Sequence, residues 1–342
     1  MRYRTTTTTM LVCAAILLVG LGASPGVAAA APSPGALLEP HGVAVFEWHR
    51  LSQVNSRVSD QRLAALSAEG FRTVYADVGE YLEVADQPYS RTQQNRLGQL
   101  RSELRRFVAR AAKKGLAVHG VGGGPNWTDD THRYLGPLLL DLVADYNQAV
   151  LANERLQGVQ LDIEPYVEDS FWDNVDLALR RYLAVLADIV AHYRDVVWTG
   201  DRSRDLRLGF AVPFWFDGKA PDVPPVWFGD PPKLAGATGH LIDLLHDYSD
   251  AYVLVMAYRN FTATEDGSIA HVQDEFAYAR DCLCGIVIGQ EFTKVYPQKL
   301  SFWWKGRAAF WQAADELATA YSGPSFRGLS VNDLSAYQAA PA

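Results

Sequence analysis

The sequence predicts a single domain of the α/β class, a (β/α)8 TIM barrel. Eight short apolar runs rich in β-branched and aromatic residues recur along the chain, helical patterns lie between them, and no low-complexity linker follows residue 40. Strands that alternate with helices pair in parallel, and eight such units close into a barrel. An open doubly wound sheet is the main alternative. Its usual phosphate-binding loop is not matched by the glycine run at 120–124, because Pro125 follows directly.

The first 31 residues are expected to be a secretory signal peptide. Arg2 and Arg4 give a basic start, residues 10–23 are apolar, and alanines at 28–31 offer a cleavage site. The apolar run is shorter than the ~20 residues that span a bilayer. We therefore expect a secreted protein with a short linker at 32–40 and the barrel at 41–342.

Eight strands are expected, each a short apolar run bounded by turn residues or a helical pattern. They are residues 43–48, 71–78, 116–121, 158–164, 206–214, 251–258, 285–291 and 328–332. Ser59 can cap a helix that ends before Gly70, and leucines at helical spacing mark residues 93–114 with Gly115 as the stop. The other expected helices are 138–151, 175–196 and 308–320, with shorter ones at 240–246 and 272–279.

Composition and charge exclude several partner classes. The formal net charge is −8, and loss of the two arginines in the signal segment makes the chain more acidic. Nucleic acids and anionic membranes need clustered positive charge. We expect neither as a partner after signal cleavage, and we expect a monomer that acts on a neutral substrate. No histidine-rich spacing indicates a metal, so no metal and no cofactor are expected.

Two cysteines, Cys282 and Cys284, remain after the signal segment, in a C-x-C arrangement. A disulfide at this spacing would be tight and uncommon, so two buried thiols or a partly exposed redox pair are expected instead.

The fourth predicted strand carries the main candidate for catalysis. From residue 159 onward its odd-numbered residues are aliphatic, and its even-numbered residues are Gln160, Asp162 and Glu164. Because side chains alternate along a strand, the polar set is expected to point into the barrel and to reach its mouth at Glu164. Two carboxylates buried side by side raise a pKa, which suits a general acid. A salt-bridge network that braces the barrel is the structural alternative.

The segment Asp162-Ile163-Glu164 resembles the D-x-E end of the D-x-x-D-x-D-x-E signature of family 18 glycoside hydrolases, the chitinase-like barrels. Met256-Ala257-Tyr258 on the sixth strand is similar to the M-x-Y motif of that family. The resemblance implies that Glu164 protonates the glycosidic oxygen as general acid. It implies that Asp162 orients and charge-balances the reacting group, and that Tyr258 hydrogen-bonds it.

Three positions depart from this pattern. Gln157 and Gln160 stand where the signature has its two earlier acids, and Arg259 stands where an acid usually follows M-x-Y. The resemblance is therefore to a distant, chitinase-like bacterial secreted protein.

Glu291, which ends the seventh predicted strand, supports a second interpretation. A glutamate that ends strand four and another that ends strand seven resemble the acid/base and nucleophile of retaining (β/α)8 glycosidases. The two carboxyl groups stand ~5–5.5 Å apart in such enzymes. In this hypothesis Glu291 is the nucleophile; in the alternative it is a rim residue paired with a nearby cation.

Side chains at the other strand ends suit a carbohydrate. Indole faces stack on the C–H faces of sugar rings, while carboxylates and amides hydrogen-bond the hydroxyls. Any one of these aromatic residues can instead serve packing. The candidate substrate-binding residues are Glu47, Trp48, Asp77, Trp127, Trp215, Arg259 and Asn332.

These observations predict a secreted glycoside hydrolase that cleaves a polysaccharide or oligosaccharide. The alternatives are a retaining enzyme with Glu291 as nucleophile, a carbohydrate-binding barrel without catalysis, and another hydrolase or lyase that uses the same carboxylates on a cell-wall polymer.

Overall fold

In a computed structural model of the chain, residue 38 and residues 41–198 and 206–342 are described. All of them fall within one compact unit. The expected signal peptide at 1–31 and the linker at 32–40, Leu38 excepted, lie outside the described residues.

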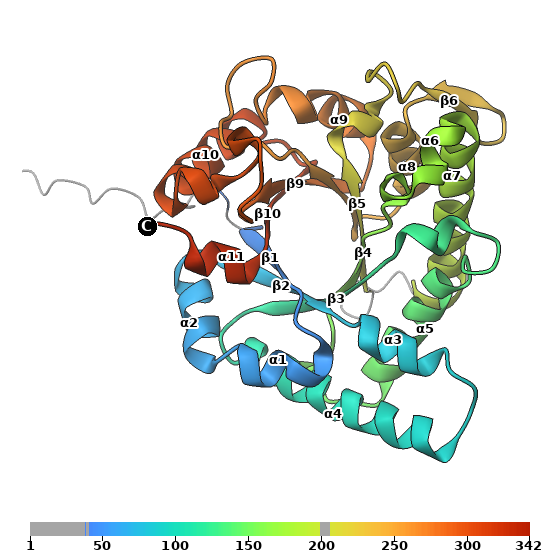
Figure 1. Cartoon of the computed structure of the whole chain (residues 1–342), viewed down its shortest axis with the longest axis vertical. Coiled ribbons are helices and arrows are strands. Elements are labelled where there is room, and N and C mark those ends of the chain that lie inside the picture. Colours follow the sequence, from blue (N-terminus) through green and yellow to red (C-terminus); the bar gives the residue numbers. More distant parts are fainter. Residues whose placement is uncertain (1–37, 39–40, 199–205) are drawn as a thin grey trace, which may run out of the picture. The chain divides into compact units, whose positions relative to one another are not determined.

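Eight parallel strands close into a barrel, which confirms the predicted α/β fold class (Figure 1). The order around the barrel is β1-β10-β9-β8-β5-β4-β3-β2, and it closes where β1 pairs with β10. The strands are β1 Val43–Glu47, β2 Phe71–Asp77, β3 Ala117–Gly122, β4 Gly158–Leu161, β5 Arg207–Pro213, β8 Ala251–Met256, β9 Gly285–Glu291 and β10 Phe326–Asn332. Each corresponds to one predicted strand. A small antiparallel sheet of β6 Val226–Phe228 and β7 Lys233–Ala235 is inserted between β5 and β8.

Helices surround the barrel, as Figure 1 shows. They are α1 Leu51–Arg57, α2 Asp60–Ala68, α3 Gly79–Ala85, α4 Arg91–Ala112, α5 Leu135–Gln148, α6 Asp169–Asp173, α7 Val175–His192, α8 Ala237–Leu245, α9 Gln273–Tyr278, α10 Arg307–Ala320 and α11 Leu334–Ala339. Ser59 caps α2 as predicted, because its hydroxyl accepts the Arg62 backbone N–H at 3.2 Å. The predicted helix at 175–196 ends earlier, and a π-helical turn, Tyr193–Val197, follows it.

Two apolar clusters stabilise the barrel. The larger one joins one face of the strands to the surrounding helices. The smaller one takes alternate strand residues, among them Phe46, Tyr75 and Met256. Since alternate residues point to opposite faces of a strand, this second cluster fills the barrel interior.

The glycine run between β3 and the next helix lets two strands approach closely. A Cβ atom on Gly123 would lie 2.1 Å from the backbone oxygen of Asp162, so any other residue here would collide with the main chain that follows β4. The backbone N–H of Asp162 donates to the Gly122 carbonyl at 3.0 Å. The position of Asp162 therefore depends on the glycines of the neighbouring strand.

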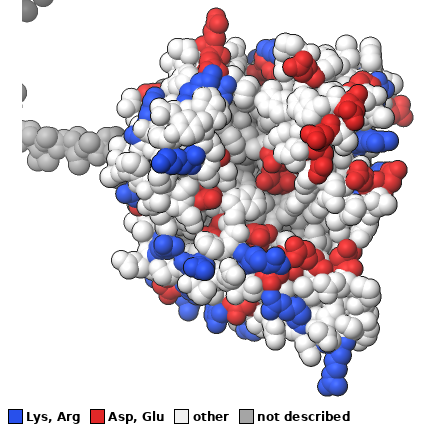
Figure 2. All heavy atoms as spheres, viewed as in Figure 1, with Lys and Arg blue, Asp and Glu red and all other residues white. Residues whose placement is uncertain are grey.

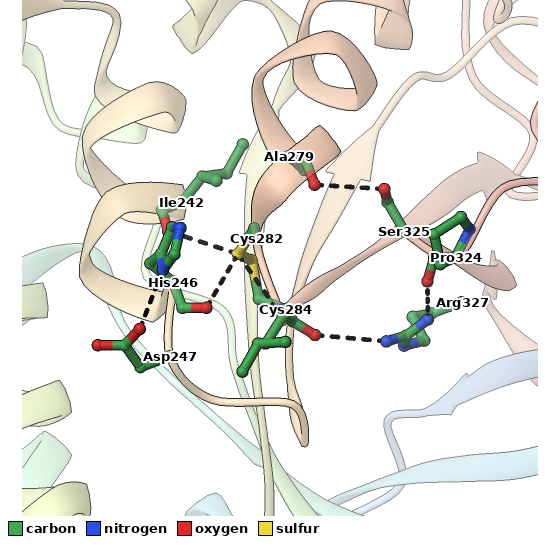
Figure 3. Close-up of a disulfide and its surroundings, with 10 residues drawn as sticks. Ile242, His246, Asp247, Ala279, Cys282, Cys284, Pro324, Ser325 and Arg327 are labelled. Atoms are coloured by element: carbon green, nitrogen blue, oxygen red, sulfur yellow. Dashed lines mark hydrogen bonds and ion pairs between the residues drawn. A yellow bond between two sulfur atoms is a disulfide. The ribbon is translucent and has the colours of Figure 1, made fainter.

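Cys282 and Cys284 form a disulfide, so the expectation of two buried thiols is wrong (Figure 3). Their Cα atoms are 5.2 Å apart, within the range that disulfides take. The turn that brings them together is held by the residue between them: the Leu283 backbone N–H donates to the His246 carbonyl at 2.9 Å, at the end of α8.

Glu275 on α9 gives the fold a dependence on pH. Its side chain is buried, its Oε1 has no hydrogen-bond partner among the described residues, and burial raises its pKa to about 8. The folded state therefore keeps a proton that the unfolded chain releases near pH 4.3. As the pH rises from about 4.5 to 8, the unfolded chain is increasingly favoured because its Glu275 can ionise. The free energy of unfolding therefore decreases over this pH range.

We expect Glu275→Gln to remove this penalty. Its melting temperature relative to wild type should rise between pH 5 and pH 8 by several degrees, measured by thermal unfolding at each pH. Glu265→Gln, at an exposed position, is the control and should show no such trend. A difference that is constant with pH would show that Glu275 is ionised in the folded state throughout.

Candidate active site at the barrel mouth

A cavity of about 450 Å³ opens at the carboxyl ends of the strands. Figure 2 shows acidic side chains around the hollow in the middle of this face. Seven of the predicted site residues line the cavity, and these come from five different strand ends: Trp48, Asp162, Glu164, Trp215, Tyr258, Arg259 and Asn332. Phe46, Tyr166, Phe214 and Met256 add to its walls.

The two carboxyl groups of Asp162 and Glu164 stand on the extended segment that continues β4. The strand itself ends at Leu161, and Pro165 begins a short 3-10 turn. Ile163, between the two acids, is buried in the cluster beneath the helices. Asp162 and Glu164 therefore both face the cavity, on the side opposite to Ile163.

Burial shifts the titration of both acids in the same direction. It raises the pKa of Asp162, and the neighbouring charge of Glu164 raises that pKa further. Burial also raises the pKa of Glu164, against a smaller lowering effect from the Tyr166 hydroxyl that donates to it. No cationic side chain of the described residues offsets either carboxyl, which gives the salt-bridge alternative no support. The pair therefore shares a proton to a higher pH than isolated carboxyls would.

Two tyrosines supply hydroxyl groups near this pair. Tyr166 donates to Glu164 Oε1, and its ring packs edge-on against Trp215 with centroids 4.9 Å apart. Burial and the charges of Glu291, Asp162 and Glu164 raise the pKa of Tyr258 well above its usual range, so its hydroxyl stays protonated. Tyr166 was not predicted. Strand alternation would put Tyr166 on the same face as Glu164, two positions earlier, only if the strand continued. Because Pro165 ends the strand, the direction of the Tyr166 side chain could not be predicted.

Glu291 lies at the end of β9, but it is held by other groups. Asn332 Nδ2 donates to its Oε2 at 2.9 Å, and the Thr293 backbone N–H donates to its Oε1. Asn332 Oδ1 in turn accepts the Trp48 indole N–H at 2.8 Å. Glu291 is buried and, among the described residues, is not part of the cavity wall. Its contacts are those of a positioning residue for Asn332 and, through it, Trp48.

The remaining predicted residues differ in their exposure to the cavity. Glu47 is buried at the end of β1, accepts the His49 backbone N–H at 2.8 Å and contacts the His49 ring, away from the cavity wall. Arg259 lines the cavity, but its charge is paired with Asp266 at 2.7 Å.

A second cavity of about 290 Å³ adjoins the first and holds the other two predicted residues, Asp77 and Trp127. Trp48 and Asp162 line both cavities, so the two form a continuous cleft. The glycines at 122–124 form part of its floor.

Within the described residues no group of three or more His, Cys, Asp or Glu side chains has the geometry to hold a metal ion. No described helix has both the length and the apolar character needed to cross a membrane.

Comparison with protein-family models and with curated protein sequences gives no match. Solved structures that resemble the chain include a family 18 chitinase from Cycas revoluta in complex with (GlcNAc)3, at 12% identity over 86% of this chain and 95% of that one, with a TM-score of 0.47. A family 18 chitinase from Pseudoalteromonas aurantia has 13% identity over 85% and 93%, with a TM-score of 0.47. A family 5 glycoside hydrolase from Prevotella bryantii has 10% identity over 90% and 98%, with a TM-score of 0.49. At these identities the likeness concerns the fold alone.

Proposed function

We propose that the protein is a secreted glycoside hydrolase with Glu164 as general acid. The observation that carries the proposal is the pair of half-buried, mutually repelling carboxyls of Asp162 and Glu164 in one wall of an aromatic-lined cavity. Glycoside cleavage needs a carboxylic acid that keeps its proton near neutral pH and a carboxylate beside it. This pair supplies one proton and one negative charge.

The proposed reaction begins when the protonated Glu164 donates its proton to the glycosidic oxygen. The bond between that oxygen and the anomeric carbon breaks, and positive charge develops on the sugar ring. The Asp162 carboxylate stabilises this charge, and the Tyr258 hydroxyl hydrogen-bonds the reacting group. A water molecule then adds to the anomeric carbon, and its proton returns to Glu164. Trp48 and Trp215 hold sugar rings against their faces.

The test is sugar release by the chain without residues 1–31. Its incubation with neutral, acidic and amine-bearing polysaccharides should raise the concentration of reducing ends with at least one of them. Binding of a polysaccharide without any release would instead favour a carbohydrate-binding barrel.

The pH profile tests the coupling between the two acids. In Asp162→Asn the neighbouring charge of the pair is gone, so the pKa of Glu164 should fall from the upper pKa of the pair, while burial still holds it above its ordinary value. Because Glu164 acts in its protonated form, the alkaline limb of the kcat/KM profile should move to lower pH, together with a loss of rate. Asp188→Asn, at an exposed acid on α7 that is paired with Arg133, should leave the limb in place. If the alkaline limb of the kcat/KM profile is the same in Asp162→Asn as in wild type, the two carboxyls do not titrate as a pair.

A further inference from the structure

The second cavity has a strongly acidic wall. Four carboxylates line it, from Asp77, Glu83, Asp86 and Asp162, and none of the described residues that line it is Lys, Arg or His. The first cavity differs, because Arg259 is part of its wall. Negative charge is therefore concentrated on the side of the cleft between α3 and the loop that follows β3.

The contacts of these carboxylates leave their charge largely uncompensated within the cavity. Asp77 Oδ1 accepts the Gly79 backbone N–H at 2.7 Å, and Asp86 accepts the Tyr134 hydroxyl at 2.7 Å. Both donors are neutral. Glu83 is paired with Arg50 at 2.7 Å, where both side chains are exposed. Asp162 Oδ1 is buried without a hydrogen-bond partner among the described residues.

Electrostatics and shape together indicate what fits here. Burial raises the pKa of Asp77 and the charge of Glu83 raises it further, while Arg50, which is not part of the cavity wall, opposes this rise only in part. The walls also carry the indoles of Trp48 and Trp127, which suit the apolar face of a sugar ring. The acids do not converge into a group that holds a metal ion, so a larger organic cation matches the cavity better. A sugar that bears a protonated amine combines both properties.

We propose that the cavity formed by Asp77, Glu83, Asp86, Trp48 and Trp127 is a subsite for an amino sugar with a free, protonated amine. The substrate is then a polysaccharide that carries unacetylated amino groups, which replaces the neutral substrate expected from composition. The inference rests on the proposed function, because Asp162 joins this subsite to the general acid. A chain that binds along the cleft places an amine-bearing sugar next to the bond that Glu164 protonates.

The test measures binding separately from cleavage. Isothermal titration of the Glu164→Gln variant compares a glucosamine tetramer with the N-acetylglucosamine tetramer of the same linkage. We expect the amine-bearing tetramer to bind at least tenfold more tightly at low salt, and the difference to shrink as salt screens the charges. Asp77→Asn in the same background should reduce the preference severalfold, and Asp77→Asn with Asp86→Asn should abolish it. Asp188→Asn, at an exposed acid on α7 paired with Arg133, is the matched control and should leave the preference unchanged.

The outcomes separate the two proposals. Equal affinities for the two tetramers, or a preference that survives the Asp77 and Asp86 substitutions in variants that melt like the parent, would overturn the amine subsite even if wild type cleaves a neutral glycan. A preference lost in those variants, with no cleavage of any polysaccharide by wild type, would support the subsite and contradict the hydrolase. If the Asp77 and Asp86 substitutions weaken the binding of both tetramers equally, the amine subsite is also overturned, because the carboxylates then affect the shape of the cavity and do not recognise the amine.

Discussion

Glu164→Gln is expected to lower the rate of glycoside cleavage by about 10²- to 10⁴-fold, the contribution of a positioned general acid. Glutamine has nearly the same shape and keeps an acceptor for the Tyr166 hydroxyl, but it has no proton to give to the leaving oxygen. The substitution also removes one of two repelling carboxyls from a buried wall, so the variant should melt at or above the wild-type temperature. Initial rates on the polysaccharide that wild type cleaves, measured with thermal unfolding, check both parts.

Glu168→Gln is the matched control for this variant. Glu168 lies four residues further along the same segment and is exposed, and its side chain makes no capping hydrogen bond to α6. It should retain the wild-type rate. Cleavage by Glu164→Gln at the wild-type rate would remove Glu164 from the reaction and turn attention to the other carboxyls of the cleft.

Gly123→Ala is expected to have the largest effect among substitutions that touch no catalytic side chain. Its Cβ would lie 2.1 Å from the carbonyl oxygen and 2.4 Å from the carbonyl carbon of Asp162. Backbone atoms cannot rotate away, so the segment that carries Asp162 and Glu164 must shift. Overpacking of this kind costs about 1–3 kcal/mol of stability or more. We expect a lower melting temperature and at least a tenfold loss of kcat, because the two carboxyls move with the backbone.

Gly98→Ala separates this effect from the general consequence of adding a methyl group. Gly98 lies within α4, and a Cβ there meets no atom within 4 Å. Alanine favours a helix over glycine by about 0.5–1 kcal/mol, so this variant should melt slightly higher with an unchanged rate. A Gly123→Ala protein that matches wild type in both measurements would show that β3 and the segment after β4 separate easily.

The barrel was predictable because each of its strands is a short run of apolar residues between helical patterns. Helices α1, α3, α6 and α11 were not expected, since each has seven residues or fewer, and an apolar stripe that repeats over two turns at most is easily missed. Helix α9 is equally short, but it was expected. Strand β10 begins at Phe326, two residues before the predicted start. Gly328 has a φ of 92° and coincides with a shift in the pairing register, so the apolar pattern is broken there.

The candidate site was predictable where strand alternation fixes direction, and not where it depends on tertiary contacts. Alternation along β4 was enough to place Asp162 and Glu164 on the inner face. The contact of Glu291 with Asn332 joins the ends of two strands, and no local pattern relates these two residues. The disulfide was missed because spacing alone does not give the distance between two Cα atoms. The acidic wall around Asp77 comes from β2, α3 and the loop after β3, and only the closed barrel brings these together.

The hydrogen bonds from Trp48 to Asn332 and from Asn332 to Glu291 cross the seam at which the barrel closes. Trp48 follows the first strand, Asn332 ends the last, and β1 pairs with β10 along that seam. Trp48, to which we assign a sugar ring, is therefore oriented by a residue at the end of β10. A chain cut before β10 lacks the amide that holds the indole, so the proposed stacking of a sugar ring on Trp48 depends on closure of the barrel.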